Sequence, residues 1–590
     1  MIVKMKKATL LVSAKQQLEA LKRLRQLGVF HVKFVQNPQS EDADRLRMEA
    51  AQTEKALSLL RPGAEGSGPE HPETARQTVS KILDLARKHD TAAAQLAEKQ
   101  GIRNWFKQWG DFSWSSVQAL SKAGLFIRLY VVDKGTLKNL PEDRYTVVLG
   151  KSGGSFRIAR FAFSPEDRLG LKEENIPPVE AAGLEADIRN ILSEVAAIES
   201  EMVLLSRERG SLTGHRNRLK KQIEFASVLS GMGVEDRFVY IQGFCPREAV
   251  QDLIHAAEQE DWGYAVEEPD DPAEVPTLIR NPKWIRIIHP LIKFMGTVPG
   301  YEEKDISLWF LLFFILFFAM LIGDAGYGIV FIILTFITQK KAGKKAPQEF
   351  YRLLHVASAA TVVWGAASGV WFGIPQIARL PFFRNLVIPQ LDASVKDNSS
   401  FMIYLCFIIA VVQLTLAHVI NAFKIINSPR AFADVGWICI LWPIFFLAGY
   451  LVLSRPMPHY AVWMFTVGAV LTLVFSNFQK NVFKGMLTTL ISLPFSILGS
   501  FSDTFSYLRL YAVGIAGATV STSFNDMLLG TGHSALGLVI AVVFLFLIHA
   551  LNMVLGCMSV IVHGVRLNLL EFSGHLGMSW TGRRYEPFRE

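Results

Sequence analysis

Two arginines stand in apolar segments near the end of this 590-residue chain. Arg509 lies in FSYLRLYAVGIAGATVSTSF (505–524), and Arg566 lies in HGVRLNLLEF (563–572). An arginine at membrane depth costs about 2.5–3.5 kcal/mol even on lenient insertion scales, and it stays protonated in any environment. An opposite charge within about 4–6 Å lowers the pKa of a carboxyl group. Each arginine would therefore favour the ionised form of a carboxyl group brought beside it.

Each arginine also belongs to a row of small or polar residues at helical spacing. Small residues let another helix approach closely, and polar rows on long apolar helices line hydrated paths. Both rows therefore indicate a helix surface that faces a second helix or water. The first row is Ser502, Ser506, Arg509, Ala512, Ala516, Thr519 and Ser523. The second row is Asn552, Gly556, Ser559, His563 and Arg566.

A structural role is the alternative for each of these charged residues. Arg509 would then pair with Asp503 or Asp324. Arg566 would extend its side chain to the membrane surface. His563 alone is more often a hydrogen-bonded buried histidine, but its position in the arginine row leaves both interpretations open. Two further histidines in apolar segments are expected to be structural, His418 and His549.

Apolar segments fill the second part of the chain, residues 301–590, and predict an all-α polytopic membrane domain with about eight transmembrane helices. The last two segments are too long for a simple crossing. About 45 residues at 1.5 Å each give roughly 65 Å, near twice the hydrocarbon thickness. We therefore expect these two helices to be tilted. The eight segments are 306–322, 324–338, 353–371, 401–423, 433–453, 460–476, 484–528 and 535–570.

The charge pattern predicts the orientation in the membrane. Much of the basic excess lies in loops between apolar segments, such as QKKAGKK (339–345), as the positive-inside rule expects. The start of the chain lacks the apolar run of a signal peptide. We therefore expect a multi-pass protein of the cell (inner) membrane, with the N-terminal half and the C-terminus in the cytoplasm. The formal charge of +8 does not require nucleic acid as a partner, and the four cysteines lack metal-like spacing.

Residues 1–300 predict an α+β cytoplasmic domain with two α/β lobes. A strand–helix–strand pattern at 1–36 recurs at 238–268, which suggests one lobe built from both ends of this half. Strand-like segments around 125–163 predict the second lobe. Within them, GKSGGS (150–155) lacks the spacing of a phosphate-binding loop, so we expect a hairpin turn there.

Apolar residues at heptad spacing lie between the two lobes. Steps of four and three residues run through 184–205, continue in 212–226, and occur earlier in 46–60. A 3.5-residue period is typical of a coiled-coil seam. We therefore predict an antiparallel coiled-coil arm that joins the lobes, with a loop at RPGAEGSGPEHPE (61–73).

The arginine segments carry a resemblance to a known family. SDTFSYLRLYAVGIAGA (502–518) resembles the S-Y-x-R-L-x-A-x-x-x-A signature of the membrane stator subunit of V-type and archaeal-type rotary ATPases, called subunit a in eukaryotes and subunit I in prokaryotes. HGVRLNLLEF resembles the H-x-x-R-L-x-x-x-E-F motif of that family. Gly556 stands where eukaryotic members carry a glutamate, which favours the prokaryotic form. Further matches, in order along the chain, are IQGFCP (241–246), VPGYEEKDIS (298–307), GDAGYG (323–328), GVWFG (369–373) and YEPF (585–588).

This resemblance implies a non-rotating subunit that couples ATP hydrolysis or synthesis to H⁺ or Na⁺ translocation. Arg509 and Arg566 would face a rotating ring of proteolipid c subunits, between two half-channels. The other implied partners are peripheral stalk subunits, a central-stalk or rotor-cap subunit, the lipid membrane and, indirectly, the ATP-hydrolysing head subunits. No nucleotide site, cofactor or metal is expected on this chain. Candidates to line the ion path are His563, Glu571, Asn568, Asp503, Ser506 and Ser559.

The residues leave two other function classes open. A secondary transporter or channel with a cytoplasmic regulatory domain predicts internal repeats and spans broken at matching positions. The sequence shows no clear repeat of that kind. A membrane-anchored scaffold without an ion path predicts that both arginines tolerate neutral substitution.

Overall fold

The computed structural model describes residues 1–61, 72–138, 145–152, 154–343, 347–393, 395, 398–477, 482–529 and 535–590. The chain forms two compact units. The first comprises Met1–Leu11, Arg23–Lys33 and Gln242–Arg589, and the second comprises Val12–Lys22, Phe34–Ile241 and Glu590. Most of the loop predicted at 61–73 lies outside the described residues.

One sheet combines strands from both ends of the N-terminal half, as predicted. Its order is β2 (His31–Lys33), β8 (Phe238–Pro246), β1 (Met5–Ser13) and β9 (Gly263–Glu267), with β7 (Gly233–Glu235) paired to β8. Two helices accompany the strands, α1 (Gln17–Leu27) and α8 (Val250–Gln259). Helix α1 ends before Gly28, whose φ of +62° is a left-handed conformation that favours glycine. The strand–helix–strand prediction is therefore confirmed at both places.

A second sheet contains the strands predicted around 125–163. Its order is β4 (Thr146–Ser152), β5 (Ser155–Ala162), β3 (Phe126–Asp133) and β6 (Glu173–Glu174). Strands β4 and β5 pair antiparallel with Ser152 opposite Ser155, so the hairpin is confirmed. Two helices lie next to β3 in sequence, α4 (Trp114–Lys122) and α5 (Lys134–Lys138).

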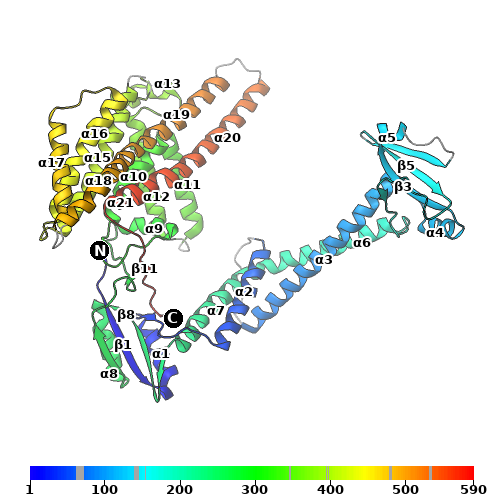
Figure 1. The fold of residues 1–590 in the computed structure, drawn as a ribbon, viewed down its shortest axis with the longest axis horizontal. Helices are drawn as coiled ribbons and strands as arrows, with labels where there is room; N and C mark the ends of the chain where they lie inside the picture. Colours follow the sequence, from blue (N-terminus) through cyan, green and yellow to red (C-terminus); the bar gives the residue numbers. More distant parts are fainter. Residues whose placement is uncertain are drawn as a thin grey trace. The chain divides into compact units, whose positions relative to one another are not determined.

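Four helices of the second unit pack in pairs. They are α2 (Glu41–Leu59), α3 (Pro72–Trp109), α6 (Leu184–Leu205) and α7 (Arg209–Ser230). Helices α3 and α6 run antiparallel (Figure 1), since Lys81 pairs with Glu201 and Lys99 with Asp187. The heptad residues of α6 are buried or half-buried between exposed neighbours. The heptad steps in the sequence did not predict α3, although its 38 residues supply the partner surface for α6.

The C-terminal part of the chain is helical. By length and composition, four of its described helices can cross a membrane: α15 (Ser399–Lys424), α16 (Ala431–Leu453), and the long helices Phe483–Leu528 and Val539–His575. A fifth crossing is counted if α10 (Ser307–Ile322) and α11 (Ala325–Ala342), bent by 118° against each other, form one span. Two further helices lie at predicted positions, α12 (Gln348–Ala367) and α17 (Tyr460–Phe475).

The long helices are assembled from shorter elements. The first contains α18 (Val482–Ser506) and α19 (Leu508–Leu529), and the second contains α20 (Ala535–Ser559) and α21 (Ser573–His575). Two π-helical segments, Val560–Gly564 and Leu567–Phe572, connect α20 to α21. The remaining elements are short: β10 (Pro276–Thr277), α9 (His289–Met295), α13 (Pro375–Ala378), α14 (Pro381–Arg384) and β11 (Arg583–Arg584).

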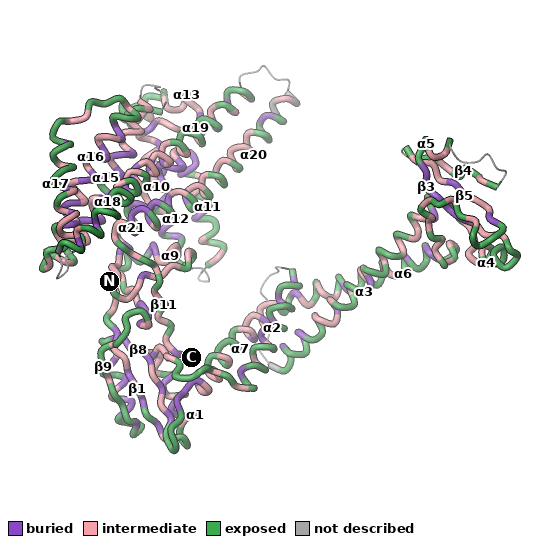
Figure 2. The backbone as a smooth tube through the Cα atoms, in the orientation of Figure 1, coloured by how far each residue is buried: buried purple, intermediate pink, exposed green. Residues whose placement is uncertain are grey.

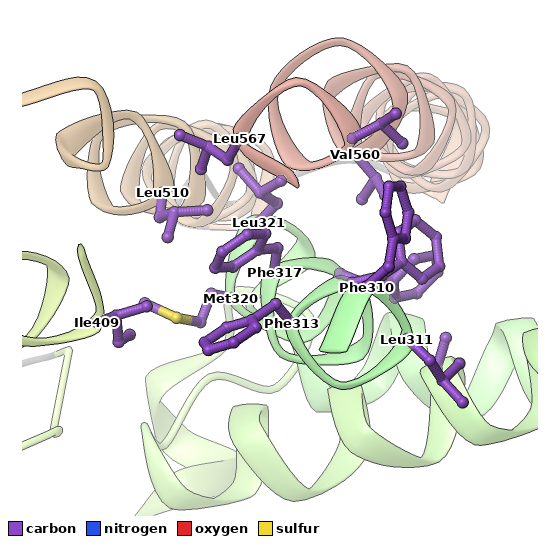
Figure 3. Packing of buried hydrophobic residues seen from close by; sticks show 14 of the residues in the cluster. Phe310, Leu311, Phe313, Phe317, Met320, Leu321, Ile409, Leu510, Val560 and Leu567 are labelled. Atoms are coloured by element: carbon purple, nitrogen blue, oxygen red, sulfur yellow. The ribbon is translucent and has the colours of Figure 1, made fainter. Parts of the chain in front are cut away.

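Helix α10 lies at the centre of the membrane core. Its sequence is apolar on all sides, as expected for a buried helix. Figure 3 shows Phe313 and Phe317 among side chains from other helices, including Leu510 of α19 and Leu567 of the second π-helical segment. This packing holds the two arginine-bearing helices against one common support.

Candidate functional site

The two long helices leave much of their surface uncovered. In the most apolar window of Phe483–Leu528, 17% of the residues are buried, and in that of Val539–His575, 11%. The same windows of α15 and α16 are 50% and 44% buried. Figure 2 shows the exposed outer sides of α19 and α20. Apolar helices with so few buried residues are expected to contact lipid or another membrane protein.

The row of small and polar residues predicted around Arg509 lies on this uncovered surface. Ala512, Ala516, Thr519 and Ser523 are all exposed, and Ser506 is half-buried. The helix is interrupted at Tyr507, between α18 and α19, where the Ser506 carbonyl accepts a hydrogen bond from Arg509 Nε over 2.9 Å. This bond holds the Nε side of the Arg509 guanidinium at the helix interruption.

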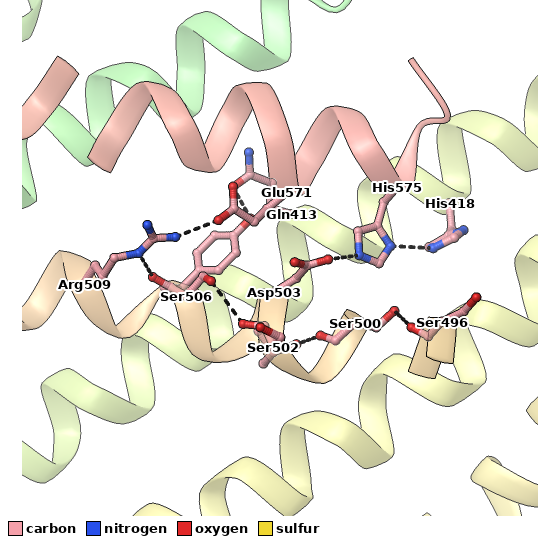
Figure 4. A network of polar contacts seen from close by, with 12 residues as sticks. Gln413, His418, Ser496, Ser500, Ser502, Asp503, Ser506, Arg509, Glu571 and His575 are labelled. Atoms are coloured by element: carbon pink, nitrogen blue, oxygen red, sulfur yellow. Dashed lines mark hydrogen bonds and ion pairs between the residues drawn. The ribbon is translucent and has the colours of Figure 1, made fainter. Parts of the chain in front are cut away.

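Arg509 and Arg566 share one carboxylate, that of Glu571 (Figure 4 shows the Arg509 contact). The Nη2 atom of Arg509 lies 2.6 Å from Glu571 Oε1, and the Nε atom of Arg566 lies 3.8 Å from the same oxygen. The Glu571 side chain is only 4% exposed, whereas that of Arg566 is 55% exposed. The structure therefore gives Arg509 a partner other than the two predicted, Asp503 and Asp324.

Those two aspartates have other partners. Asp324 is buried and caps α11, where its Oδ1 accepts from the backbone N–H of Gly326 over 2.7 Å. Asp503 contacts His575 instead. The sequence could not predict the Arg509–Glu571 pair from spacing within one helix, because Glu571 belongs to a different helix.

A buried amide network lies on the same π-helical segment as the Glu571 carboxylate. Gln413 of α15 donates from Nε2 to Asn568 Oδ1 over 2.9 Å and accepts from the Tyr507 hydroxyl over 2.9 Å. Asn568 and Glu571 both belong to the second π-helical segment, and π-bulges occur frequently at functional sites. Sequence reasoning missed Gln413 and Tyr507. The available signal was a glutamine in the middle of an apolar span, where polar residues are costly.

A chain of four titratable side chains lies beside the arginine site. Asp503 Oδ2 is 3.2 Å from His575 Nε2, His575 Nδ1 is 3.1 Å from His418 Nε2, and His418 Nδ1 is 2.9 Å from Asp434 Oδ1. Figure 4 shows the first two of these contacts in line. His575 and Asp434 were not identified as candidates, and His418 was expected to be structural.

The remaining candidates of the second row are less connected. His563 is half-buried, and its Nδ1 is buried without a hydrogen-bonding partner among the described residues. Ser559 is also half-buried. Among the described residues, Oε2 of Glu571 and Nδ2 of Asn568 are likewise buried and unpartnered. Several polar atoms near the two arginines could therefore form a hydrogen bond with a further group.

A second polar cluster lies farther along the same two helices. The Tyr327 hydroxyl is 2.8 Å from Ser521 Oγ and 2.7 Å from His549 Nδ1, while Asn552 Nδ2 donates to Ser521 over 2.7 Å. His549 Nε2 in turn contacts Asn525 over 3.2 Å. Ser521 follows Arg509 by twelve residues, or about 18 Å of helix. Asp503 precedes Arg509, so the two clusters lie on opposite sides of the arginine.

Comparison with known proteins then decides the family. A V-type ATP synthase subunit I from Treponema pallidum is 30% identical over 633 residues, which cover all of both chains. The corresponding protein of Borreliella burgdorferi is 30% identical over 629 residues, again over all of both chains. The chain belongs to the V-type ATP synthase subunit I family. The resemblance carried by the two arginine motifs is thereby confirmed.

Other comparisons are weaker. An A-type ATP synthase subunit I from Methanocaldococcus jannaschii is 24% identical over 72% of this chain and 66% of its own. The crystal structure of the cytoplasmic N-terminal domain of a V-ATPase subunit I aligns over 99% of its length and 44% of this chain, at 17% identity and a TM-score of 0.26, which is too low to establish a shared fold. No protein-family model matches the chain. Family membership and the apolar helices make this chain a membrane subunit of a rotary ATPase.

Proposed function

We propose that the chain provides the ion path beside the c ring of a rotary ATPase, with Arg509 as its central residue. The observation that carries this proposal is the position of Arg509 and Arg566 around one buried carboxylate, on helices whose outer surface is uncovered. A row of small residues on that surface would let the ring helices approach closely.

The charge of the site suits a ring carboxylate. Two guanidinium groups and the Glu571 carboxylate sum to one positive charge if all three are ionised. A ring carboxyl group that crosses lipid must be neutral, with its ion bound, because an unpaired charge is costly there. Beside Arg509 the ionised carboxylate is favoured, so the group releases its ion at this place. The same cation would block ions that pass straight from one access path to the other.

The two polar clusters support separate access paths on the two sides of Arg509. The cluster of Asp503 and His575 would serve the side of the N-terminal half, and the cluster of Ser521 and His549 would serve the opposite side. Polar residues inside a membrane domain are expensive and line such paths in many transport proteins. His563, Asn568, Ser506 and Ser559 would contribute polar groups next to the arginines.

The rest of the chain would hold this site still while the ring turns. We propose that residues 1–300 form a cytoplasmic domain whose paired helices act as a coiled-coil arm that anchors the peripheral stalks. The central-stalk or rotor-cap subunit and the ATP-hydrolysing head would be contacted through the assembled complex. Residues 301–590 would form the membrane domain with eight crossings, both termini in the cytoplasm, and the two long helices tilted along the ring.

The test is ATP-driven ion uptake into membrane vesicles that contain the complex with Arg509→Gln. We expect uptake to be lost while the complex still assembles, because the substitution removes the cation and keeps a polar side chain. Assembly is measured on the same membranes by copurification of the proteolipid ring and the nucleotide-binding subunits. Arg455→Gln is the matched control, since the guanidinium Cζ of Arg455 lies over the Tyr404 ring, 3.8 Å from its centroid. Normal uptake with Arg509→Gln would make the arginine structural.

A further inference from the structure

A cavity of about 860 Å³ lies between α9 and three helices of the C-terminal part. These three helices are α10, α12 and the second long helix, Val539–His575. Most of the lining side chains are apolar, and they include Phe294, Phe314, Phe318, Leu353, Val560 and Ile561. Phe294 and Ile561 are exposed, so the cavity is open to the surroundings of the helices. Apolar walls of this kind favour a hydrocarbon chain over water.

Three basic side chains line the same cavity, those of Arg286, Lys293 and Arg584. All three residues are exposed. The Nη2 atom of Arg286 lies 3.0 Å from Oε1 of Glu349, which also belongs to the lining. Among the described residues, no carboxylate pairs with Lys293 or Arg584. Burial lowers the pKa of His289 below its ordinary value of 6.5, so this histidine is neutral and the lining carries a net charge of +2 near neutral pH.

Helix α9 and the turn before it have the surface of a segment that lies at a membrane interface. Ile288 and Leu291 pack against the membrane core. On the outer side, Phe294 is 74% exposed and directly follows Lys293. Trp284, which precedes the helix, is 60% exposed. Exposed aromatic rings next to basic residues are typical of segments at the level of the lipid headgroups.

The cavity lies close to the basic segment that predicts the orientation in the membrane. Pro347 belongs to the lining, and it follows QKKAGKK (339–345) by two residues. The positive-inside rule assigns such a segment to the cytoplasmic side. Basic pockets between membrane helices on that side bind the headgroups of anionic lipids.

An anionic phospholipid matches both parts of the cavity. Its phosphodiester is a charged acceptor, and guanidinium and ammonium groups form strong hydrogen bonds with phosphate oxygens. Its acyl chains would cover apolar side chains such as Phe314 and Ile561. The ion pair with Glu349 holds the Arg286 guanidinium at the cavity. A zwitterionic phospholipid adds an ammonium group, which the basic side chains repel, so the cavity selects against it.

We propose that this cavity binds an anionic phospholipid, with the phosphate at Arg286, Lys293 and Arg584 and the acyl chains along α10, α12 and the second long helix. The inference goes beyond the proposed ion path and does not depend on Arg509. A lipid in this place fills the space between α9 and the helices behind it, and it stabilises the folded membrane domain because it binds the folded state alone.

The test measures lipid binding to the complete purified chain in a nonionic detergent. Native mass spectrometry counts bound phosphatidylglycerol and bound phosphatidylcholine that carry the same acyl chains. We expect phosphatidylglycerol to bind more tightly, and Arg286→Gln and Lys293→Gln each to weaken its binding about five-fold. Ile561→Trp keeps every charge but narrows the apolar part, so it should weaken this binding as well. Lys340→Gln is the matched control, since Lys340 is an exposed cation in the last turn of α11, outside the lining of the cavity.

Several outcomes would overturn the lipid site. Equal binding of the two lipids by the unmodified chain contradicts it, as does phosphatidylglycerol binding that none of the three cavity variants weakens. Displacement of the bound lipid by inorganic phosphate at equal concentration would show a site for free phosphate instead. Phosphatidylglycerol that binds the chain but not the complete complex would assign the cavity to a neighbouring subunit.

The proposal stays testable if one variant does not fold. Arg286→Gln leaves Glu349 without its partner, so Lys293→Gln decides in that case. Lipid binding is measured without ATP or ion transport. Failure of the lipid site would therefore leave the proposed ion path standing, and failure of the ion path would leave the lipid site standing.

Discussion

Arg509 and Glu571 are 62 residues apart in sequence, yet the guanidinium Nη2 lies 2.6 Å from the carboxylate Oε1. The contact joins the two long helices at the level where each is irregular: α19 begins after the interruption at Tyr507, and Glu571 lies in a π-helical segment. A charge-assisted bond of this kind fixes the direction of the arginine. A carboxylate that approaches this site would therefore meet the Arg509 guanidinium in a fixed orientation.

Glu571→Gln should impair ion translocation although the residue is buried. Without the carboxylate, the guanidinium of Arg509 is no longer oriented, and a displacement of about 1 Å can cost about 100-fold in rate. We expect ATP-driven uptake to fall by that order while the complex assembles. Glu302→Gln is the control, since Glu302 is an exposed acid at the edge of the membrane domain. Equal uptake in the two variants would contradict an orienting role for Glu571.

Arg566→Gln should be milder than Arg509→Gln. Arg566 is more exposed and lies 3.8 Å from the shared carboxylate oxygen, against 2.6 Å for Arg509. Coulomb attraction falls with distance, and solvent and salt screen an exposed charge. We expect Arg566→Gln to retain measurable uptake under conditions in which Arg509→Gln retains none. The reverse ranking in the same vesicle assay would show that Arg566 is the central cation.

Gln413→Leu should lower the stability of the membrane domain. It leaves the Tyr507 hydroxyl and the side-chain oxygen Oδ1 of Asn568 buried without their partner. Each unsatisfied buried group costs about 1–3 kcal/mol, so the two groups together predict a loss of about 2–6 kcal/mol in the free energy of unfolding. Denaturant unfolding of the chain in detergent measures this loss. Gln376→Leu, at an exposed position of α13, should change the stability little.

Glu49→Gln should remove part of the acid sensitivity of the second unit. Burial tends to raise the pKa of Glu49, but its bonds to Arg76 and His215 outweigh burial and hold the pKa below its ordinary value of 4.5. A carboxyl group whose pKa is lowered by folding stabilises the fold fully above its unfolded pKa. That stabilisation is lost as the pH falls below about 4.5 through the lower folded value.

The measurement is thermal unfolding of the chain between pH 3 and 7. We expect the unmodified chain to lose stability below the ordinary pKa of Glu49 and the Glu49→Gln variant to lose less. Glu54→Gln is the control on the same helix, because Glu54 forms an exposed pair with Lys220 at 3.1 Å. The same acid dependence in all three proteins would exclude Glu49 as a source of it.

Ile188→Ala should loosen the pairing of α3 and α6. Ile188 is buried against Phe106 and Leu184, and truncation of such a side chain costs about 2–5 kcal/mol. Leu192→Ala, four residues along on the exposed side of α6, should cost far less. Amide hydrogen exchange in α3 and α6 of the complete chain reports the difference. Faster exchange after Leu192→Ala than after Ile188→Ala would contradict the predicted heptad seam.

Local patterns in the sequence predicted much of the fold. The strand-like segments of the two lobes, the heptad steps of α6 and the apolar runs of α15 and α16 are each contained within a short stretch of sequence. The helices and strands therefore follow from local patterns. Helix α3 escaped because its apolar stripe is interrupted by polar residues. The boundary between α10 and α11 was predicted, but their 118° bend and the interruption at Tyr507 were not, since the direction of a helix depends on packing against other helices.

The sequence by itself determined the family and the two arginines, because both motifs are contiguous stretches whose residue types are unusual in an apolar segment. Only the tertiary structure decided the partners of those arginines. Glu571 reaches Arg509 from another helix, Gln413 joins Tyr507 to Asn568, and His418 meets His575 across 157 residues. The spacing within one helix fixes which side chains share a face, but the distance between two helices is set by how their surfaces pack.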